Sequence, residues 1–441
     1  MARTAKKEQS MTIDEKMDQA LVPDVEQPYR VPNNWCWGYL TKSFVECKDS
    51  FRKPINANER SKRIGNVPYY GATGQVGWID DYLTDEELVL LGEDGAPFLE
   101  VSKDKAYLIN GKAWVNNHAH ILKSHFGHVG NQYILNYLNV FNYTEYVNGT
   151  TRLKLTQSSM DTIPVPIPPL SEQKRIVERI ESLFAKLDEA KEKAQAVVDG
   201  FEDRKAAILH KAFAGELTEE WRKTNGVGFD TWKDYSIGDL FSHTTGKALK
   251  KSDTNGTLRK YITTSNLYWG RFDFSEIREM YFADNELEKC TARKGDLLIC
   301  NGGDVGRAAI WDYDYDICMQ NHISRLRKKG NNVDILFFYY YFMLSKLKGL
   351  VNGKGIGIAS LSAKDLLAMQ VKMPIIEEQI EISKKLEKLL NKEQKVKETA
   401  EQAIDQIDSM KKSTLTRAFR GELGTNDPND EPAIELLKRI I

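Results

Sequence analysis

A gapless internal repeat is the feature that most constrains how this chain can fold. Residues 168–217 and 374–423 align at a constant offset of 206 positions, and 18 of the 50 aligned residues are identical. Unrelated segments of average composition agree at roughly one position in fifteen. Because loops tolerate insertions and deletions, a match of this length without a gap predicts a rigid element of fixed length in each half of the chain.

Both copies carry the hydrophobic spacing of a helix that packs along another helix. Apolar residues recur in alternating steps of four and three, which is the a/d pattern of a coiled coil, and Glu393 is the one polar residue within it. The alternative is that each helix packs only against its neighbouring globular segment. The predicted seam consists of Ile176, Ile180, Leu183, Leu187, Ala190, Ala194, Val197 and Phe201 in the first copy, and of Ile382, Leu386, Leu389, Val396, Ala400, Ala403, Ile407 and Met410 in the second.

The ends of the predicted helices carry their own signals. The pair Pro168-Pro169 stiffens the entry to the first copy, and we expect Ser171 to serve as its N-cap. Gly215 and Gly421 follow the two copies where a helix-terminating residue belongs. A helix over residues 171–213 would be roughly 65 Å long at 1.5 Å per residue.

The repeat extends more faintly into the segments that flank the helices. Asn117-His118 corresponds to Asn321-His322, and the offset drifts by several residues there. Both flanking segments mix strand-like stretches, short helices and Gly- and Asn-containing loops, so we predict an α+β protein with two α/β-mixed domains in a pseudo-twofold tandem repeat. The expected divisions are an N-terminal tail with a short helix (1–30), a first domain (31–167), a first helical region (168–223), a second domain (224–373), a second helical region (374–424) and a C-terminal tail (425–441).

The composition excludes several classes of protein. Hydrophobic residues make up 41% and charged residues 28% of the chain, as in ordinary globular proteins. The five cysteines form no C-x-x-C pair and are odd in number, so we expect neither a disulfide framework nor a zinc site, and a reducing, cytoplasmic location. The sequence contains no run of 18 apolar residues and begins with a polar segment, so we expect neither a membrane span nor a secretion signal.

The motifs of common catalytic sites are missing from the sequence. There is no N-P-P-[FY] or D-P-P-[FY] loop of an amino-methyltransferase and no Walker A P-loop. His118 and His120 form an H-x-H pair without a third ligand in view, so we predict no metal site. Glu100 and Lys103 lack the acidic partner of a nuclease site, and we expect them to form an exposed ion pair. We therefore predict a chain that is not an enzyme and holds no cofactor of its own.

The repeated phrases at the helix ends carry a resemblance to a known family. PIPPLSEQKRIVERIE and KAAILHKAFAGELTEEWR open and close the first helix, MPIIEEQIEI and KKSTLTRAFRGEL repeat that signature in the second, and VPNNWCW and FDTWKDY are the Trp-containing entry segments. From about residue 31 to 424 the chain resembles the specificity subunit of type I restriction-modification systems. The doubled P-x-x-x-E-Q and A-F-x-G-E-L phrases at fixed spacing make this resemblance specific.

The resemblance implies a function in phage defence. Each globular segment would be a target recognition domain that reads one half of a bipartite, asymmetric site in double-stranded DNA. The two helices would pair antiparallel and hold the halves apart, and the chain end would return near its start, so that the two tails pack together or on a partner. Two methyltransferase subunits, which bind S-adenosylmethionine and methylate adenine, would dock on the helices, and as many as two restriction subunits that use ATP and Mg would join. The partner-binding candidates are Ile176, Ile180, Leu183, Leu187, Ile382, Leu386, Leu389 and Val396.

Candidate DNA contacts follow from the chemistry of recognition. Base edges are read by polar side chains on loops, and phosphates are bound by cations and small donors. The candidates in the first domain are Arg52, Lys53, Arg60, Lys62, Arg63, Tyr69, Tyr70, Thr73, Gln75, Lys112, Trp114, Asn116, Asn117, His118 and His120. Those in the second are Lys247, Lys250, Lys251, Thr263, Thr264, Ser265, Asn266, Asn301, Arg307, Gln320, Asn321, His322, Arg325, Arg327 and Lys354.

The repeat separates these candidates into two groups. The halves of an asymmetric site differ, so the shared Asn117-His118 and Asn321-His322 are expected to shape the backbone or grip phosphate. The unshared residues Gln75, Lys112, Arg307 and Gln320 are then the candidates for base reading.

The charge balance bears on affinity. The chain has 62 basic and 63 acidic residues, and only the second domain is basic, with 21 basic against 17 acidic residues. We therefore expect weak, steeply salt-dependent DNA binding by the isolated chain, with partner subunits supplying further phosphate contacts. Two alternatives stand beside this reading: a coiled-coil scaffold that does not read sequence, and a fused methyltransferase or nuclease.

Overall fold

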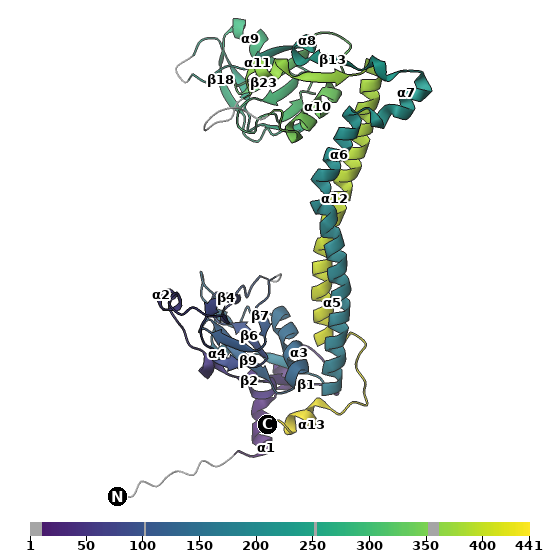
Figure 1. The fold of residues 1–441 in the computed structure, drawn as a ribbon. Helices are drawn as coiled ribbons and strands as arrows, with labels where there is room; N and C mark the ends of the chain where they lie inside the picture. Colours follow the sequence, from purple (N-terminus) through teal and green to yellow (C-terminus); the bar gives the residue numbers. More distant parts are fainter. Residues whose placement is uncertain (1–10, 101–102, 251–253, 352–360) are drawn as a thin grey trace, which may run out of the picture. The chain divides into compact units, whose positions relative to one another are not determined.

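The structure, a computed structural model, describes residues 11–100, 103–250, 254–351 and 361–441 (Figure 1). The chain divides into two compact units. Unit 1 joins Met1–Ala194 to Gln402–Ile441, and unit 2 is Gln195–Glu401. Each unit therefore combines one globular domain with parts of both long helical regions.

The globular domain of unit 1 is built on two four-stranded sheets. One has the strand order β2-β9-β6-β7 and the other β4-β3-β8-β5, in which β3 and β8 run parallel. Strands β1 and β12 form a separate antiparallel ribbon, with Cys36 opposite Ile167. The strands are β1 (Cys36–Tyr39), β2 (Val45–Cys47), β3 (Val67–Gly71), β4 (Gly74–Ile79), β5 (Thr84–Asp85), β6 (Leu88–Gly92), β7 (Ala106–Ile109), β8 (Lys112–Val115), β9 (Ala119–Ser124) and β12 (Pro164–Ile167), and the hairpin β10 (Val147–Asn148) and β11 (Lys154–Leu155) lies apart.

The domain of unit 2 repeats the topology of both four-stranded sheets and of the ribbon. Its sheets have the orders β14-β23-β20-β21 and β18-β15-β22-β19, with β15 and β22 parallel, and the ribbon β13–β24 places Lys233 opposite Met373. The strands are β13 (Lys233–Ser236), β14 (Phe241–Thr245), β15 (Thr257–Ile262), β18 (Arg278–Phe282), β19 (Thr291–Ala292), β20 (Leu297–Cys300), β21 (Ala308–Ile310), β22 (Ile317–Met319), β23 (Ile323–Lys328) and β24 (Gln370–Met373), with an extra hairpin of β16 (Leu267–Tyr268) and β17 (Arg271–Phe272). The duplication is thus explicit in the topology, where the sequence shows it only faintly.

The long helical regions form α5 (Leu170–Asp199), α6 (Phe201–Phe213) and α12 (Ile376–Phe419). The first region was expected to be one helix, but Gly200 separates α5 from α6. The break is slight, because the Gly200 N–H still donates to Ala196 O and the Arg204 N–H to Gly200 O. Ser171 is not the N-cap that the sequence suggested, since α5 already begins at Leu170.

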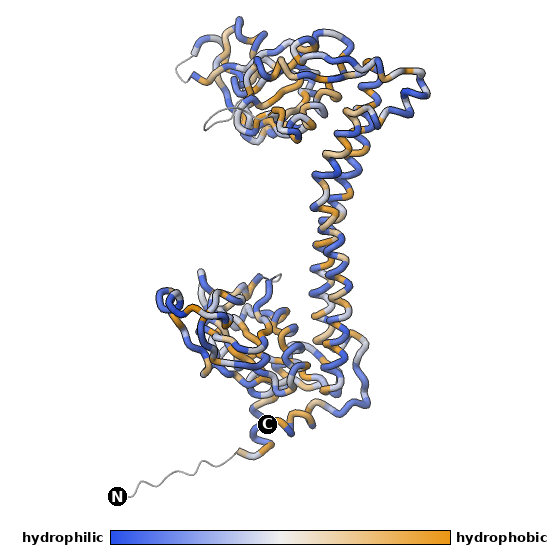
Figure 2. Tube along the Cα trace, viewed as in Figure 1, coloured by the Kyte–Doolittle hydropathy of each residue, from blue (hydrophilic) through white to orange (hydrophobic). Residues whose placement is uncertain are grey.

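Within each unit the helices pair antiparallel. In unit 1, Lys191 of α5 pairs with Asp408 of α12 at 2.7 Å, and Asp188 pairs with Lys411 further along α12. In unit 2, Arg204 of α6 pairs with Glu393 at 2.7 Å, so the one polar residue of the predicted seam has an ionic partner. Figure 2 shows hydrophilic and hydrophobic residues alternating along these helices, as expected for amphipathic segments.

Several seam residues lie elsewhere than predicted. Val396 and Met410 are 40% and 55% exposed, whereas Ala400 and Ile407, which lie between them in the same repeat, are buried. Four residues proposed to contact partner subunits are instead buried in the cores of their own units, which corrects that assignment. They are Ile176 and Ile180 in unit 1, and Ile382 and Leu386 in unit 2. Leu183, Leu187 and Leu389 are half-buried.

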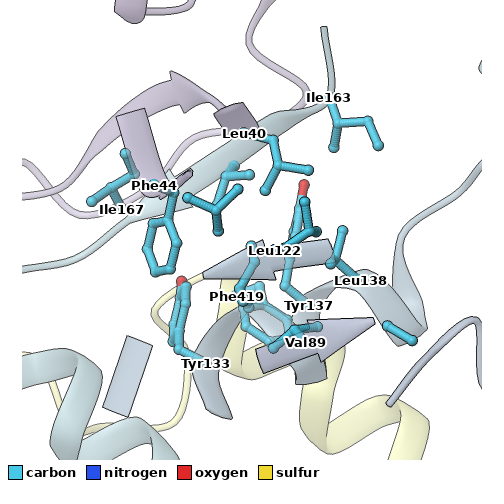
Figure 3. Packing of buried hydrophobic residues seen from close by; sticks show 14 of the residues in the cluster. Leu40, Phe44, Val89, Leu122, Tyr133, Tyr137, Leu138, Ile163, Ile167 and Phe419 are labelled. Atoms are coloured by element: carbon cyan, nitrogen blue, oxygen red, sulfur yellow. The ribbon is translucent and has the colours of Figure 1, made fainter. Parts of the chain in front are cut away.

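The core of unit 1 joins the sheet to the end of α12. The helix α3 (Gly127–Val140) covers sheet β2-β9-β6-β7 and buries Tyr133 and Tyr137. The ring of Phe419 packs edge-on against both tyrosines, with centroid distances of 5.2 and 5.1 Å (Figure 3). The corresponding helix in unit 2 is α10 (Ile335–Leu347), where Phe337 contacts Phe213 of α6. Each domain is thus fastened to its helices by aromatic packing.

The repeated motifs meet at the helix junctions. In unit 2 the buried carboxylate of Glu378 accepts hydrogen bonds from Thr218, Arg222 and Trp232. In unit 1 its counterpart Glu172 accepts from Thr425 and Arg175. The Glu of P-x-x-x-E-Q therefore holds the chain that follows A-F-x-G-E-L.

The neighbouring residues of both motifs also have structural roles. Gln173 and Gln379 each donate a side-chain hydrogen bond to the carbonyl of the motif proline. Gly215 and Gly421 adopt φ of +78° and +71°, as expected of residues that end a helix.

The two tails lie together in unit 1. Lys16 of α1 (Ile13–Ala20) donates to the backbone oxygen of Ile441 at 2.8 Å, just beyond α13 (Ala433–Lys438). Across the described ranges, none of the helices has an apolar stretch long enough to cross a lipid bilayer.

Candidate nucleic-acid interface

The turn between β8 and β9, residues 116–118, is the centre of the candidate surface in the first domain. It borders a cleft of 1090 Å³ that is also lined by Thr73 and Arg152. On its other side lies a hollow of 570 Å³ lined by Asn56 and Arg60. The structure therefore brings together predicted residues from three separate segments of the chain. Asn56 and Arg152 were not predicted, and no local pattern marks them, because only the fold places them beside this turn.

Two predicted aromatic contacts are wrong, because Tyr69 and Trp114 are core residues with 1% and 2% exposure. They instead support the basic segment 52–63. The Trp114 Nε1–H donates to the carbonyl of Lys53 at 2.8 Å, and the ring lies under the guanidinium of Arg63 at 4.6 Å. Tyr69 lies under Arg60 in the same way, at 4.9 Å.

The remaining candidates of the first domain differ in their availability. Asn116 is buried, and its Oδ1 accepts from the His118 N–H at 2.8 Å, so it shapes the turn and cannot reach a base. Arg63 pairs with Asp80 at 2.6 Å, and Lys112 lies at the other end of β8, away from the turn. Tyr70 is half-buried, and burial raises the pKa of its hydroxyl. The exposed candidates are Lys53, Lys62, Thr73, Gln75, Lys112 and Asn117, and Arg60 and His118 are half-buried.

In the second domain the turn between β22 and β23, residues 320–322, occupies the equivalent position. Gln320 and Asn321 are half-buried and His322 is exposed. Arg307 stacks on Tyr268 at 5.0 Å and donates to the carbonyl of Thr264 at 2.5 Å. Lys250 and Ser265 are exposed, and Asn301 and Thr264 are half-buried. Lys251 and Lys354 lie outside the described residues.

Other predicted contacts of the second domain have internal partners. Arg325 is buried and donates to the carbonyls of Glu288 and Thr291 at the end of α9 (Asp284–Cys290), so its prediction as a DNA contact is wrong. Asn266 and Thr263 are both buried in one loop, where the Thr263 N–H donates a hydrogen bond to the Oδ1 of Asn266.

Two further cations of the second domain are engaged in ion pairs. Arg327 binds both carboxylate oxygens of Asp296, at 2.8 and 2.7 Å. Lys247 pairs with Glu286 at 2.7 Å.

A hollow in the second domain that is lined by three basic and three acidic residues was not predicted: Arg259, Lys260, Arg293, Asp284, Glu288 and Asp316. It has a volume of 660 Å³ and also includes Tyr315 in its lining. Arg259 and Lys260 are both exposed although they lie on the internal strand β15. No strand was predicted over residues 257–262, so sequence reasoning did not place these two side chains on a common surface.

The H-x-H pair is split by the structure. His118 is partly exposed near Asp94, with Nδ1 3.5 Å from Oδ2, whereas His120 is fully buried against Asp49 and Glu93. Sequence reasoning missed both of these carboxylates, which come from distant segments. Three such donors are typical of a metal site, but the guanidinium of Arg52 already pairs with both carboxylates.

The charges within this cluster lower the pKa values of its two carboxyl groups. Burial alone raises the pKa of the Asp49 carboxyl, but the hydrogen bond and charge of His120, with Ile121 N–H and Arg52, outweigh it and lower that pKa. Burial also raises the pKa of the Glu93 carboxyl, but Arg52, His120 and Lys154 together outweigh this effect and lower that pKa. Glu100 and Lys103, the other pair considered for catalysis, form an exposed ion pair at 2.6 Å, as expected.

Comparison with known proteins agrees with this architecture. The family model of the type I restriction modification DNA specificity domain matches residues 44–198 and 230–406. A putative type I restriction enzyme specificity subunit of Haemophilus influenzae is 26% identical over 361 residues, covering 80% of this chain and 88% of that subunit. The EcoKI specificity subunit of Escherichia coli is 26% identical over 279 residues, and this match spans 60% of this chain and 59% of that protein.

A solved structure supports the fold. The HsdS subunit from Thermoanaerobacter tengcongensis superposes with a TM-score of 0.59 at 16% identity, over 90% of this chain and 100% of that chain. Both of these curated relatives are named as specificity subunits of type I restriction enzymes. Two matched specificity domains, duplicated topology and paired helices together show that the chain belongs to the type I restriction-modification DNA specificity family, as a DNA-recognition subunit.

Proposed function

We propose that the two domains read the two halves of one bipartite, asymmetric site in double-stranded DNA. The observation that carries this proposal is the duplication of both four-stranded sheets and the ribbon, with different side chains at the equivalent turns. Thr73 lines the cleft beside the first turn, whereas Gln320 lies within the second turn, so one backbone frame presents two different sets of donors and acceptors. Such sets discriminate base pairs in the major groove.

The helices set the distance between the half-sites in this proposal. The helix α12 has 44 residues and is therefore about 66 Å long at 1.5 Å per residue. Two turns of DNA measure roughly 70 Å, so the base pairs between the half-sites would be left unread. Inserting one heptad into both helical regions, within residues 185–200 and at the paired part of α12, should change the permitted spacer or abolish binding. An unchanged target with an unchanged spacer would refute this role.

Partner subunits supply the chemistry and part of the affinity. Two methyltransferase subunits with S-adenosylmethionine would dock on the helices, and as many as two restriction subunits with ATP and Mg would complete the complex. The net charge of −1 supports weak DNA binding by the isolated chain, since phosphate contacts dominate affinity. Specific, tight binding by the isolated chain at physiological salt would contradict this division of labour.

The decisive experiment is methylome sequencing of a host that carries this chain with its methyltransferase partner. A bipartite motif methylated at adenine is the expected result. Exchanging residues 31–167 for the matching domain of a relative should change one half of that motif and leave the other half intact. Methylation without any bipartite motif would favour a scaffold that does not read sequence.

A further inference from the structure

A buried ionic cluster lies beneath the first recognition turn. Arg52 pairs with Asp49 at 2.8 Å and with Glu93, and it also donates to the carbonyl of Ala119 at 3.3 Å. His120 has no exposed side-chain surface. Its Nδ1 lies 2.6 Å from Asp49 and its Nε2 lies 3.0 Å from the carbonyl of Leu155. Both ring nitrogens therefore face acceptors, and four segments of the chain converge on one charged centre.

The same cluster residues hold the backbone where the chain leaves the turn 116–118. The second oxygen of Asp49 accepts from the Ile121 N–H at 2.8 Å. The Glu93 N–H donates to the carbonyl of His118 at 2.8 Å, and the Glu93 carbonyl accepts from Leu155 at 2.7 Å. The strand that leaves the turn is therefore anchored to the side chains of Arg52 and Asp49 and to the backbone of Glu93, and we expect a shift of the cluster to move the turn that carries the exposed Asn117.

The second domain builds the same backbone frame around an uncharged centre. Asn301 occupies the place of Glu93, because its N–H donates to the carbonyl of His322 and its carbonyl accepts from Leu361, both at 3.0 Å. Ser324 occupies the place of His120, and its hydroxyl lies 3.0 Å from His243 and 3.2 Å from the Asn301 amide. Burial and the nearby Arg325 lower the pKa of His243, which favours its neutral form. The two turns are thus supported by different chemistry in equivalent places.

We propose that the cluster Asp49, Arg52, Glu93 and His120 is the positioning element for reading the first half-site, and that it has no influence on the second. Arg52 holds the two carboxylates together, much as a divalent cation would, and it also begins the basic segment 52–63. This inference rests on the proposed function of the two domains. It goes further by assigning half-site specificity to residues whose charged groups bind one another, with Asp49, Arg52 and Glu93 half-buried and His120 fully buried.

The test uses the full chain in complex with its methyltransferase partner. Methylation rates are compared on duplexes that carry single base changes in either half of the wild-type motif. Arg52→Met should reduce discrimination in the first half by about tenfold or more, because small displacements of a positioning group have effects of this size, and leave the second half within about twofold. Ser324→Ala in the second domain is the matched control and should show the opposite pattern.

A second variant allows the same test if Arg52→Met destabilises the fold. Arg52→Met combined with Glu93→Gln and Asp49→Asn leaves no stranded carboxylate, so the domain should fold while the turn loses its support. Arg52→Lys should keep part of the discrimination, since lysine keeps the positive charge but lacks the planar guanidinium that binds both carboxylates at once. Equal loss in both halves, or unchanged discrimination in the first half, would overturn the proposal. If the wild-type complex itself shows no bipartite motif, the proposed function fails first.

Discussion

The buried carboxylate of Glu378 offers the sharpest test of how the domains are fastened to the helices. Its side chain has no exposed surface and accepts hydrogen bonds from Trp232 at 3.2 Å, from Thr218 at 2.7 Å and from Arg222. The side chain of Arg222 is itself only 10% exposed. Glu378→Gln would keep the shape but leave the guanidinium of Arg222 buried without a counter-charge.

The magnitude follows from that burial. Removing one partner of a buried pair costs about 3–5 kcal/mol, and we expect the lower end because the glutamine amide oxygen still accepts one hydrogen bond. A loss of about 3 kcal/mol corresponds to a roughly 150-fold increase in local opening. Hydrogen exchange of the amides in η4 (Glu216–Thr218) and α7 (Glu219–Asn225) reports this opening directly.

The matched control is Glu172→Gln in unit 1. Arg175 is 35% exposed and keeps Asp430 as a partner, so no charge is stranded there. Burial raises the pKa of Glu172 despite its bonds to Thr425 and Arg175, so its charge is less well stabilised, and we expect less than a tenfold change in exchange. Equal effects of the two substitutions, or unchanged protection in Glu378→Gln, would refute the account of these junctions.

Three further predictions follow from features described above. The folded-state pKa values of Asp49 and Glu93 are lowered, so their charged forms stabilise unit 1 at neutral pH, and this stabilisation is lost as the pH falls below about 4. Hydrogen exchange measured during an acid titration should therefore show the cluster region of unit 1 opening before the equivalent uncharged region of unit 2. Gly421→Ala should destabilise unit 1 by more than the roughly 1–2 kcal/mol that a left-handed alanine costs, because its Cβ would lie 2.4 Å from Pro32. Gly424 has the same φ of +71° but open space around it, so Gly424→Ala should show the backbone cost alone. Thermal melting of both variants measures the difference. His118→Ala should weaken DNA binding by the complex without changing the preferred sequence, and an altered methylation motif would contradict that role.

Much of the fold was predictable because its signals are local or repeated. The helical repeat is carried by fixed spacing, and the strands at 106–109 and 297–300 are bounded as their sequences suggest. The stretch 114–122 alternates like one strand, yet the structure interrupts it at the turn 116–118, because Asn116 turns its side chain back to the His118 N–H.

The candidate site was predictable only in part. Trp114 and Tyr69 were chosen as aromatic residues near polar loops, and only the fold reveals that their rings face the core and support Arg63 and Arg60. Asp49 and His120 are 71 positions apart, so no local pattern announces their contact. The residues that support the turns are thus defined by tertiary structure, whereas several exposed candidates were accessible from composition alone.

The discontinuity of unit 1 has a consequence for synthesis on the ribosome. Tyr133 and Tyr137 receive their partner Phe419 only after the whole of unit 2 has been made. At roughly 5–20 residues per second, the 225 residues from Ala194 to Phe419 take about 10–45 s to appear. Unit 2 is contiguous and can complete its core first, while the nascent N-terminal domain waits with an aromatic face uncovered. The last domain to mature is therefore the first to be translated.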